Sequence, residues 1–168
     1  LVAHSMGGLV SRRMMLDRVE SGRALGIERY VTLASPWLGN WGAGRGVKRS
    51  PVVMAMWRDM DPDGELVGHL FARRLPASVC VGLLFGYAGN NRLMPETNDG
   101  TVSIESVLRP EAQAEARFVR GFNADHDGVL SDAGAAEALS LLLGEEGPCG
   151  ATAAAPRVMR SSSSSYAV

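Results

Sequence analysis

A serine among small residues lies near the start of the chain, in the segment Ala3-His4-Ser5-Met6-Gly7. The pattern resembles a G-x-S-x-G nucleophile elbow with Ala3 in place of the first glycine, a mild departure because both residues are small. In such an elbow, the serine stands on a sharp strand-to-helix turn that exposes its Oγ. The apolar residues 1–3 before it and the apolar periodicity after it fit this context. The alternative is an ordinary glycine-rich turn without chemistry.

The residues after Ser5 predict a helix over 7–20 that begins directly behind the serine. The N-terminus of a helix carries free N–H groups and the positive end of the helix dipole. The backbone N–H of Met6 is therefore predicted to be one donor of an oxyanion hole. A serine used in this way attacks a carbonyl carbon, and it needs a base that is itself oriented by an acid.

The chain has three histidines that are candidates for the base. His4 belongs to the elbow, where we expect its side chain to point away from the base position. His69 lies in a predicted helix and fits a surface or packing role. His126 lies in a loop between a predicted strand and the last predicted helix, so we assign the base to His126. The alternative for His126 is a solvated loop residue beside two aspartates.

The acid is sought in the polar loop that follows the predicted strand 79–85. Asp99 is the best candidate, because a glycine and β-branched residues follow it and predict a tight turn. Glu96 is the second choice, and an ordinary turn aspartate is the alternative for Asp99. Asp125 and Asp127 flank His126, but adjacent residues seldom face the same way, so we expect them to be solvated or to cap a turn.

Alternating strands and helices predict an α/β fold with a mostly parallel sheet flanked by helices. Three predicted strands follow the strand end at residues 1–3. Two short helices and one long helix are predicted after the helix at 7–20. The glycine-rich segment 37–49 is predicted to be a loop, and 101–107 an irregular segment or a short helix. Ser131 is predicted to cap the last helix, and Gly144 lies at its end. The strands are expected at 27–34, 79–85 and 117–121, and the later helices at 51–57, 65–74 and 131–143.

Four segments, in order, resemble the lipase and esterase branch of the α/β-hydrolase superfamily. They are 3–8 around Ser5, Val31-Thr32-Leu33-Ala34-Ser35-Pro36, Asn98-Asp99-Gly100-Thr101-Val102 and Asp125-His126. Within that branch, the chain is most similar to bacterial lipase-like proteins and the inositol-deacylase-like group. The resemblance covers residues 1–143 and implies a Ser5-Asp99-His126 triad, in the order serine, acid, histidine.

The resemblance also implies that the chain is the C-terminal part of such a fold, truncated at its N-terminus. The family sheet has eight strands, and this chain is expected to supply about the last four. The second oxyanion-hole donor would then lie upstream, and the edge of the first strand would be open. We expect the isolated 168-residue chain to be poorly folded and nearly inactive.

A domain over 1–144 with a cap-like segment at 37–75 is predicted, followed by a disordered tail at 145–168 that is rich in Gly, Ala, Pro and Ser. The cap-like segment is rich in large apolar residues, which either form an acyl-binding wall or pack on the sheet. Substrate contact is favoured for Trp37 and Trp41, since their loop follows the end of a strand. Packing is favoured for Met54, Met56 and Leu66.

Composition limits the function further. The net charge of −1 gives no argument for nucleic acid or an anionic membrane, and no apolar stretch reaches the roughly 18 residues of a membrane span. Cys80 lies in an apolar run and Cys149 in the polar tail, so no bridge between them is expected. No cluster of His, Cys and Asp has the spacing of metal ligands, and no cofactor is predicted.

The chemistry that these residues predict is hydrolysis of a carboxylic ester, with a small-molecule or lipid ester as substrate. Two alternatives stay open. The same triad serves acyl transfer or thioester cleavage, since the pocket chooses the acceptor. A non-catalytic protein that retains the fold would also keep these motifs. The sequence indicates neither the compartment nor the acyl and alcohol groups.

Overall fold

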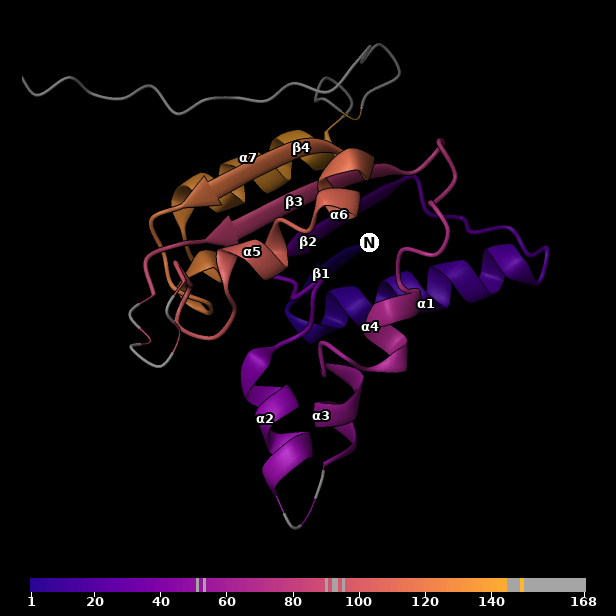
Figure 1. Ribbon diagram of the computed structural model, residues 1–168. Helices are drawn as coiled ribbons and strands as arrows, with labels where there is room; N and C mark the ends of the chain where they lie inside the picture. The colour runs from indigo at the N-terminus through magenta and orange to yellow at the C-terminus, as the bar shows by residue number, and fades with distance from the viewer. Residues whose placement is uncertain are drawn as a thin grey trace, which may run out of the picture.

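The computed structural model of the protein describes residues 1–50, 52, 54–89, 91, 94, 96–144 and 149. Four strands form one sheet in the order β1 (Val2–His4), β2 (Arg29–Leu33), β3 (Cys80–Gly86) and β4 (Ala116–Phe122). Every neighbouring pair is parallel (Figure 1). The predicted α/β fold with a parallel sheet is thus confirmed. Parallel strands need crossover connections, and the helices between them provide these.

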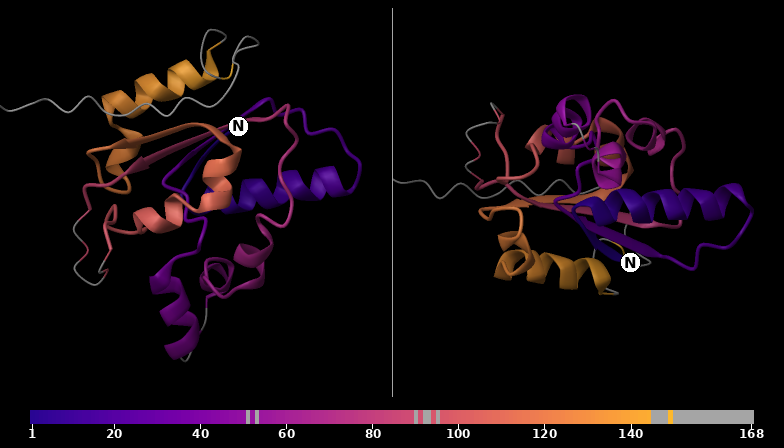
Figure 2. Two further views of the ribbon diagram at one scale, coloured as in Figure 1. Left: turned by 45° about the horizontal axis from the view of Figure 1, so that its top comes forward. Right: turned by 90° about the horizontal axis from the view of Figure 1, so that it is seen from below.

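Helices cover both faces of the sheet. Helix α1 (Met6–Glu20) lies on one face with α4 (Glu65–His69) and α6 (Pro110–Glu115), whereas α7 (Ala133–Leu143) covers the other (Figure 2). The short helix α5 (Ile104–Val107) precedes α6 along the chain. The domain therefore has three layers, helix, sheet and helix, as expected for a parallel sheet that is buried on both faces.

Two apolar clusters pack against the two faces of the sheet. One joins Leu9, Met15 and Leu16 of α1 to β2 and β3, and the other joins Ala135, Ala138 and Leu142 of α7 to β2, β3 and β4. All seven residues of β3 are buried. This explains why β3 reads in the sequence as an unbroken apolar run rather than an alternating pattern.

A buried ion pair ties α1 to α6. The Arg12 guanidinium donates two hydrogen bonds of 2.8 Å to the Glu115 carboxylate, and both side chains are almost fully buried. Its Nε and Nη2 atoms also donate to the carbonyl oxygens of Leu70 and Arg73, respectively. A buried charge is tolerated only with such partners, so this contact holds the segment after α4 against α1, the helix that follows Ser5.

The prediction of a loop over 37–49 is wrong, because residues Trp41–Arg49 form helix α2. The Asn40 side chain caps this helix by accepting hydrogen bonds from the N–H groups of Gly42 and Ala43. The glycine content reflects packing on α3 (Ala55–Asp59): a Cβ atom on Gly46 would lie 2.7 Å from the Trp57 ring. The glycine lets the two helices approach closely, and composition alone did not separate this from a loop.

Smaller differences concern the ends of elements. In place of the helices predicted at 51–57 and 65–74, the structure has the shorter helices α3 and α4. Helix α6 is not predicted from the sequence. Asp132, not Ser131, caps α7, since its Oδ1 accepts a hydrogen bond of 2.8 Å from the N–H of Ala135. Ser131 instead ends the 3₁₀ turn η1 (Gly128–Leu130).

The expectation that the two cysteines stay apart is also wrong. Cys80 of β3 and Cys149 form a disulfide, with their Cα atoms 5.5 Å apart. The predicted disordered tail at 145–168 lies, apart from Cys149, outside the described residues. Among the helices that the structure describes, none combines the length and the apolar character that crossing a membrane requires.

Gly8 marks the closest approach between α1 and the end of β2. A Cβ atom at this position would lie 2.1 Å from Ser35 Oγ and 3.2 Å from the Trp37 ring. Ser35 and Trp37 are both buried, so neither side chain has space to move away. A Cβ atom on Gly7 would meet only the Ala3 side chain, at an ordinary 3.8 Å.

We predict that Gly8→Ala destabilises the protein by about 2 kcal/mol or more, because an added methyl group overpacks a closed site. Gly7→Ala is the matched control in the same helical turn, and its free energy of unfolding should change by less than about 1 kcal/mol. Urea denaturation followed by circular dichroism measures both. Equal stability of the two variants would contradict the close approach at Gly8.

Candidate active site

The candidate site residues follow the carboxyl ends of three strands. Ser5 comes directly after β1, Asp99 lies in the loop after β3, and His126 lies in the loop after β4. Because all four strands are parallel, these ends meet at one edge of the sheet, where ligands bind in open α/β sheets. The sheet therefore brings together side chains that are up to 121 positions apart in the sequence.

Ser5 is held in a strained backbone conformation. Its φ of 52° and ψ of −131° are rare for a residue with a side chain. The N–H of Ser5 donates a hydrogen bond of 2.9 Å to the carbonyl oxygen of Leu33, and the carbonyl oxygen of Ser5 accepts one from Gly8. These two bonds fix the turn between β1 and α1. Met6 is the first residue of α1, so its N–H has no carbonyl partner within that helix.

A continuous chain of hydrogen bonds joins Ser5, His126 and Asp99. Ser5 Oγ lies 2.9 Å from His126 Nε2, and His126 Nδ1 lies 2.7 Å from Asp99 Oδ2. Asp99 is completely buried, and the solvent-exposed fraction of His126 is 8%. An ionised carboxylate is an acceptor only, so His126 Nδ1 carries a proton and Nε2 faces the serine with its lone pair. This is the tautomer that a general base needs.

The other acidic candidates have different surroundings. Glu96 is exposed and lines a pocket. The Oδ1 atom of Asp125 accepts a hydrogen bond of 2.7 Å from the N–H of Gly128, so Asp125 caps the turn after it. Asp127 is exposed. Of these acidic candidates, Asp99 is the one that lies against His126 Nδ1.

Backbone donors hold the Asp99 carboxylate in place. Its Oδ1 accepts hydrogen bonds from the N–H groups of Thr101, at 2.9 Å, and Val102, at 2.6 Å. The turn needs glycine at position 100, where φ is 99°. The Asp-Gly-Thr-Val segment therefore satisfies one carboxylate oxygen locally, which leaves Oδ2 directed at the histidine.

Asn98 is a supporting residue that the sequence analysis did not identify. It is buried, its Oδ1 accepts a hydrogen bond from the N–H of Gly100, and its Nδ2 donates to the carbonyl oxygen of Glu96. These bonds shape the loop on both sides of Asp99. An asparagine before an Asp-Gly pair is a signal for such a turn, because its side chain bonds to nearby backbone groups.

The expectation that His4 points away from the base position is wrong. The rings of His4 and His126 lie 4.8 Å apart between centroids, and His4 Nε2 lies 3.0 Å from the backbone carbonyl oxygen of His126. His4 therefore contacts the main chain of the candidate base. The third histidine, His69, is exposed at the end of α4.

The two tryptophans predicted to contact substrate have different surroundings. Trp37 is buried and packs edge-on against Phe71, with ring centroids 5.6 Å apart, so it belongs to the core. Trp41, at the start of α2, is 47% exposed. The expectation of packing is also wrong for Met54 and Met56, which are exposed. Leu66, in contrast, packs against the core.

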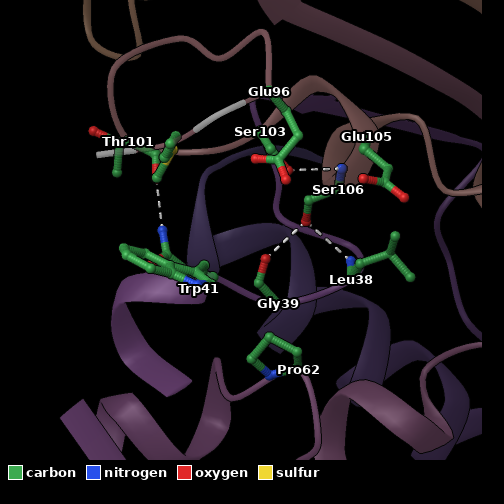
Figure 3. A pocket seen from close by; sticks show the side chains of 11 residues that line it. Leu38, Gly39, Trp41, Pro62, Glu96, Thr101, Ser103, Glu105 and Ser106 are labelled. Carbon is green, nitrogen blue, oxygen red and sulfur yellow. Dashed lines mark hydrogen bonds between the residues drawn. The ribbon is translucent and has the colours of Figure 1, made fainter. Parts of the chain in front are cut away.

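Trp41 lines a pocket of about 330 Å³ between the start of α2 and the loop that carries Asp99. Figure 3 shows the Trp41 ring on the helix side of this pocket and the Glu96 and Glu105 side chains across from it. Asn40 bridges the two sides, since its Nδ2 donates a hydrogen bond of 2.7 Å to the carbonyl oxygen of Thr101. The N–H of Thr101 also donates a hydrogen bond to Asp99, but Ser5, Asp99 and His126 do not line this pocket. A separate cavity is lined by Asp99, His126 and Thr101.

One group of side chains in the described part of the chain has the ligand spacing of a metal site. The ligand atoms of His4, His126 and Asp127 all lie within 4.8 Å of one another. Both ring nitrogens of His126 are already engaged, with Asp99 and Ser5. A metal ion on His126 would have to replace one of these bonds. The arrangement therefore fits proton transfer by His126 better than ligation.

Comparison with known families bears on the first part of the chain. Residues 1–61 match the model of a family described as "Putative serine esterase (DUF676)". The matched region includes Ser5, α1, β2 and α2, and it ends before Asp99 and His126. No curated protein and no solved structure matches the chain significantly. The first 61 residues are thus similar to a family that is described only as putative serine esterases.

Proposed function

We propose that the protein is a serine hydrolase that cleaves carboxylic esters, with Ser5 as nucleophile, His126 as base and Asp99 as the orienting acid. The observation that carries this proposal is the hydrogen-bonded chain from Ser5 Oγ through the His126 ring to Asp99 Oδ2. The strained conformation of Ser5 and the family match over residues 1–61 support it independently.

In the first half of the reaction, His126 Nε2 accepts the proton of Ser5 Oγ while the oxygen attacks the ester carbonyl carbon. The His126 ring becomes positively charged, and the buried Asp99 carboxylate stabilises it. The carbonyl oxygen becomes an oxyanion near the N–H of Met6 and the start of α1, where the helix dipole favours negative charge. The tetrahedral intermediate then expels the alcohol, which takes the proton from His126, and an acyl-enzyme remains on Ser5.

In the second half, water replaces the alcohol. His126 Nε2 removes a proton from the water molecule as its oxygen attacks the acyl carbon. The second tetrahedral intermediate collapses, the carboxylic acid leaves, and Ser5 Oγ recovers its proton from His126. The same residues thus serve both steps, and Asp99 keeps the histidine in the same orientation throughout.

The substrate is proposed to be a small-molecule or lipid ester that extends over the exposed ring of Trp41. The Trp41 ring lines the pocket that also contains Thr101 of the Asp99 loop, and an exposed aromatic surface favours contact with an apolar group. Trp37 is not included in this proposal, because the core buries it.

We predict that a fluorophosphonate probe labels the full-length protein and that Ser5→Ala in that protein abolishes the labelling, because the probe requires an activated serine. Ser131→Ala is the matched control, since Ser131 is an exposed serine at the far end of η1, and it should label like the wild type. In-gel fluorescence after a short incubation measures the signal. Equal labelling of wild type and Ser5→Ala would refute the assignment, and an unlabelled wild type would favour a non-catalytic protein.

We predict that Asp99→Asn lowers kcat/KM for an activated ester by about 10³- to 10⁴-fold, because an amide no longer holds the histidine in the required tautomer. Asp125→Asn keeps the oxygen that caps the following turn, so its kcat/KM should stay within about threefold of wild type. Hydrolysis of p-nitrophenyl acetate measures both. A larger loss in Asp125→Asn than in Asp99→Asn would transfer the acid role to Asp125.

We predict that Trp41→Ala raises KM for p-nitrophenyl esters with medium-length acyl chains by about tenfold, with kcat nearly unchanged, because it removes contact that the ground state and the transition state share. Trp41→Phe retains an aromatic surface and should recover most of the affinity. Michaelis constants over a series of acyl lengths test this. A KM that is unchanged at every acyl length would exclude Trp41 from the substrate site.

A further inference from the structure

The candidate base must reach across the sheet to the candidate nucleophile. Ser5 follows β1 and His126 follows β4, at opposite ends of the strand order. Neighbouring strands lie about 4.8 Å apart, so β1 and β4 are separated by about 14 Å. The loop after β4 therefore has to pass back over the ends of β3 and β2. Whatever fixes the end of this loop also sets the distance between the base and the serine.

Two groups of contacts anchor His126. On the acid side, its backbone N–H donates a hydrogen bond of 2.8 Å to the carbonyl oxygen of Asp99, in addition to the bond between the side chains. On the side of β1, the contacts are the bond to Ser5 Oγ and the bond between His4 Nε2 and the carbonyl oxygen of His126. In the described part of the chain, that carbonyl accepts no other hydrogen bond.

The two contacts on the β1 side behave differently during a reaction. The bond between Ser5 and His126 is exchanged at each proton transfer and is absent while an acyl group occupies Ser5 Oγ. The His4 bond uses the backbone of His126, so it does not change when the His126 ring gains or loses a proton. A carbonyl oxygen only accepts hydrogen bonds, so His4 Nε2 carries the proton and donates it.

We propose that His4 is a positioning residue that holds His126 within reach of Ser5 through all steps of the reaction. This inference rests on the proposed triad, because it assigns His4 a role only if His126 is the base. His4 is the last residue of β1 and Ser5 follows it directly. A shift of this strand end therefore moves the anchor of His126 together with the nucleophile. Well-oriented groups account for large rate effects, and small misplacements are costly.

The test compares His4→Leu, His4→Gln, Ser5→Ala and the wild type. Leucine removes the donor, whereas the Nε2 atom of glutamine reaches about as far as that of histidine and carries N–H groups. The second-order rate constant for fluorophosphonate labelling, together with kcat and KM for p-nitrophenyl acetate, is measured on each protein. Asp132→Ala, which removes the side-chain cap of α7, serves as a control for a general loss of stability.

We expect His4→Leu to reduce the labelling rate constant and kcat by roughly tenfold with little change in KM, the size of effect that one lost hydrogen bond produces. His4→Gln should recover most of the loss, and Asp132→Ala should lower the melting temperature without reducing the rate. An unchanged rate in His4→Leu, or an equal loss in His4→Gln, would overturn the positioning role. Full labelling of Ser5→Ala would instead refute the triad, so the two failures are distinguishable.

Discussion

The Asp99 carboxylate is completely buried at the edge of the sheet, and burying a charge is unfavourable unless hydrogen bonds surround it. Each of its two oxygens has different hydrogen-bond partners. Oδ1 accepts two backbone N–H groups from its own turn, and Oδ2 faces the N–H of His126. The need to hydrogen-bond the buried carboxylate therefore sets both the conformation of the loop after β3 and the orientation of the His126 imidazole. If either were displaced, the carboxylate would lose partners that water cannot replace.

Contacts in the neighbouring segments also hold the Asp99 turn and Ser5 in position. Asn98 shapes the Asp99 turn from one side, while Asn40 links the turn to the start of α2 and caps that helix. Next to Ser5, Gly8 allows α1 to lie directly against Ser35 and Trp37. Close backbone approach around the serine and dense hydrogen bonding around the aspartate thus keep the proposed nucleophile and acid at fixed positions, and His126 lies between them.

Much of this arrangement could be predicted from local patterns. The strand, turn and helix around Ser5 follow from an apolar run, small residues and helical periodicity, and the continuous apolar run of β3 predicts a strand buried on both faces. The α2 region could not be predicted in the same way. Its glycines indicate a loop by composition, yet they serve the contact between Gly46 and Trp57. The disulfide between Cys80 and Cys149 depends likewise on where distant segments meet.

The sequence by itself determined which side chains are candidates for chemistry and in which order they follow the strands, because the turn around Ser5 and the Asp-Gly turn are local structures with local signals. The tertiary structure decided which of these side chains meet. The parallel sheet placed Asp99 rather than Glu96 or Asp125 against His126, buried Trp37 while leaving Trp41 exposed, and put the His4 ring against His126. Such contacts join residues up to 122 positions apart, and no local propensity encodes them.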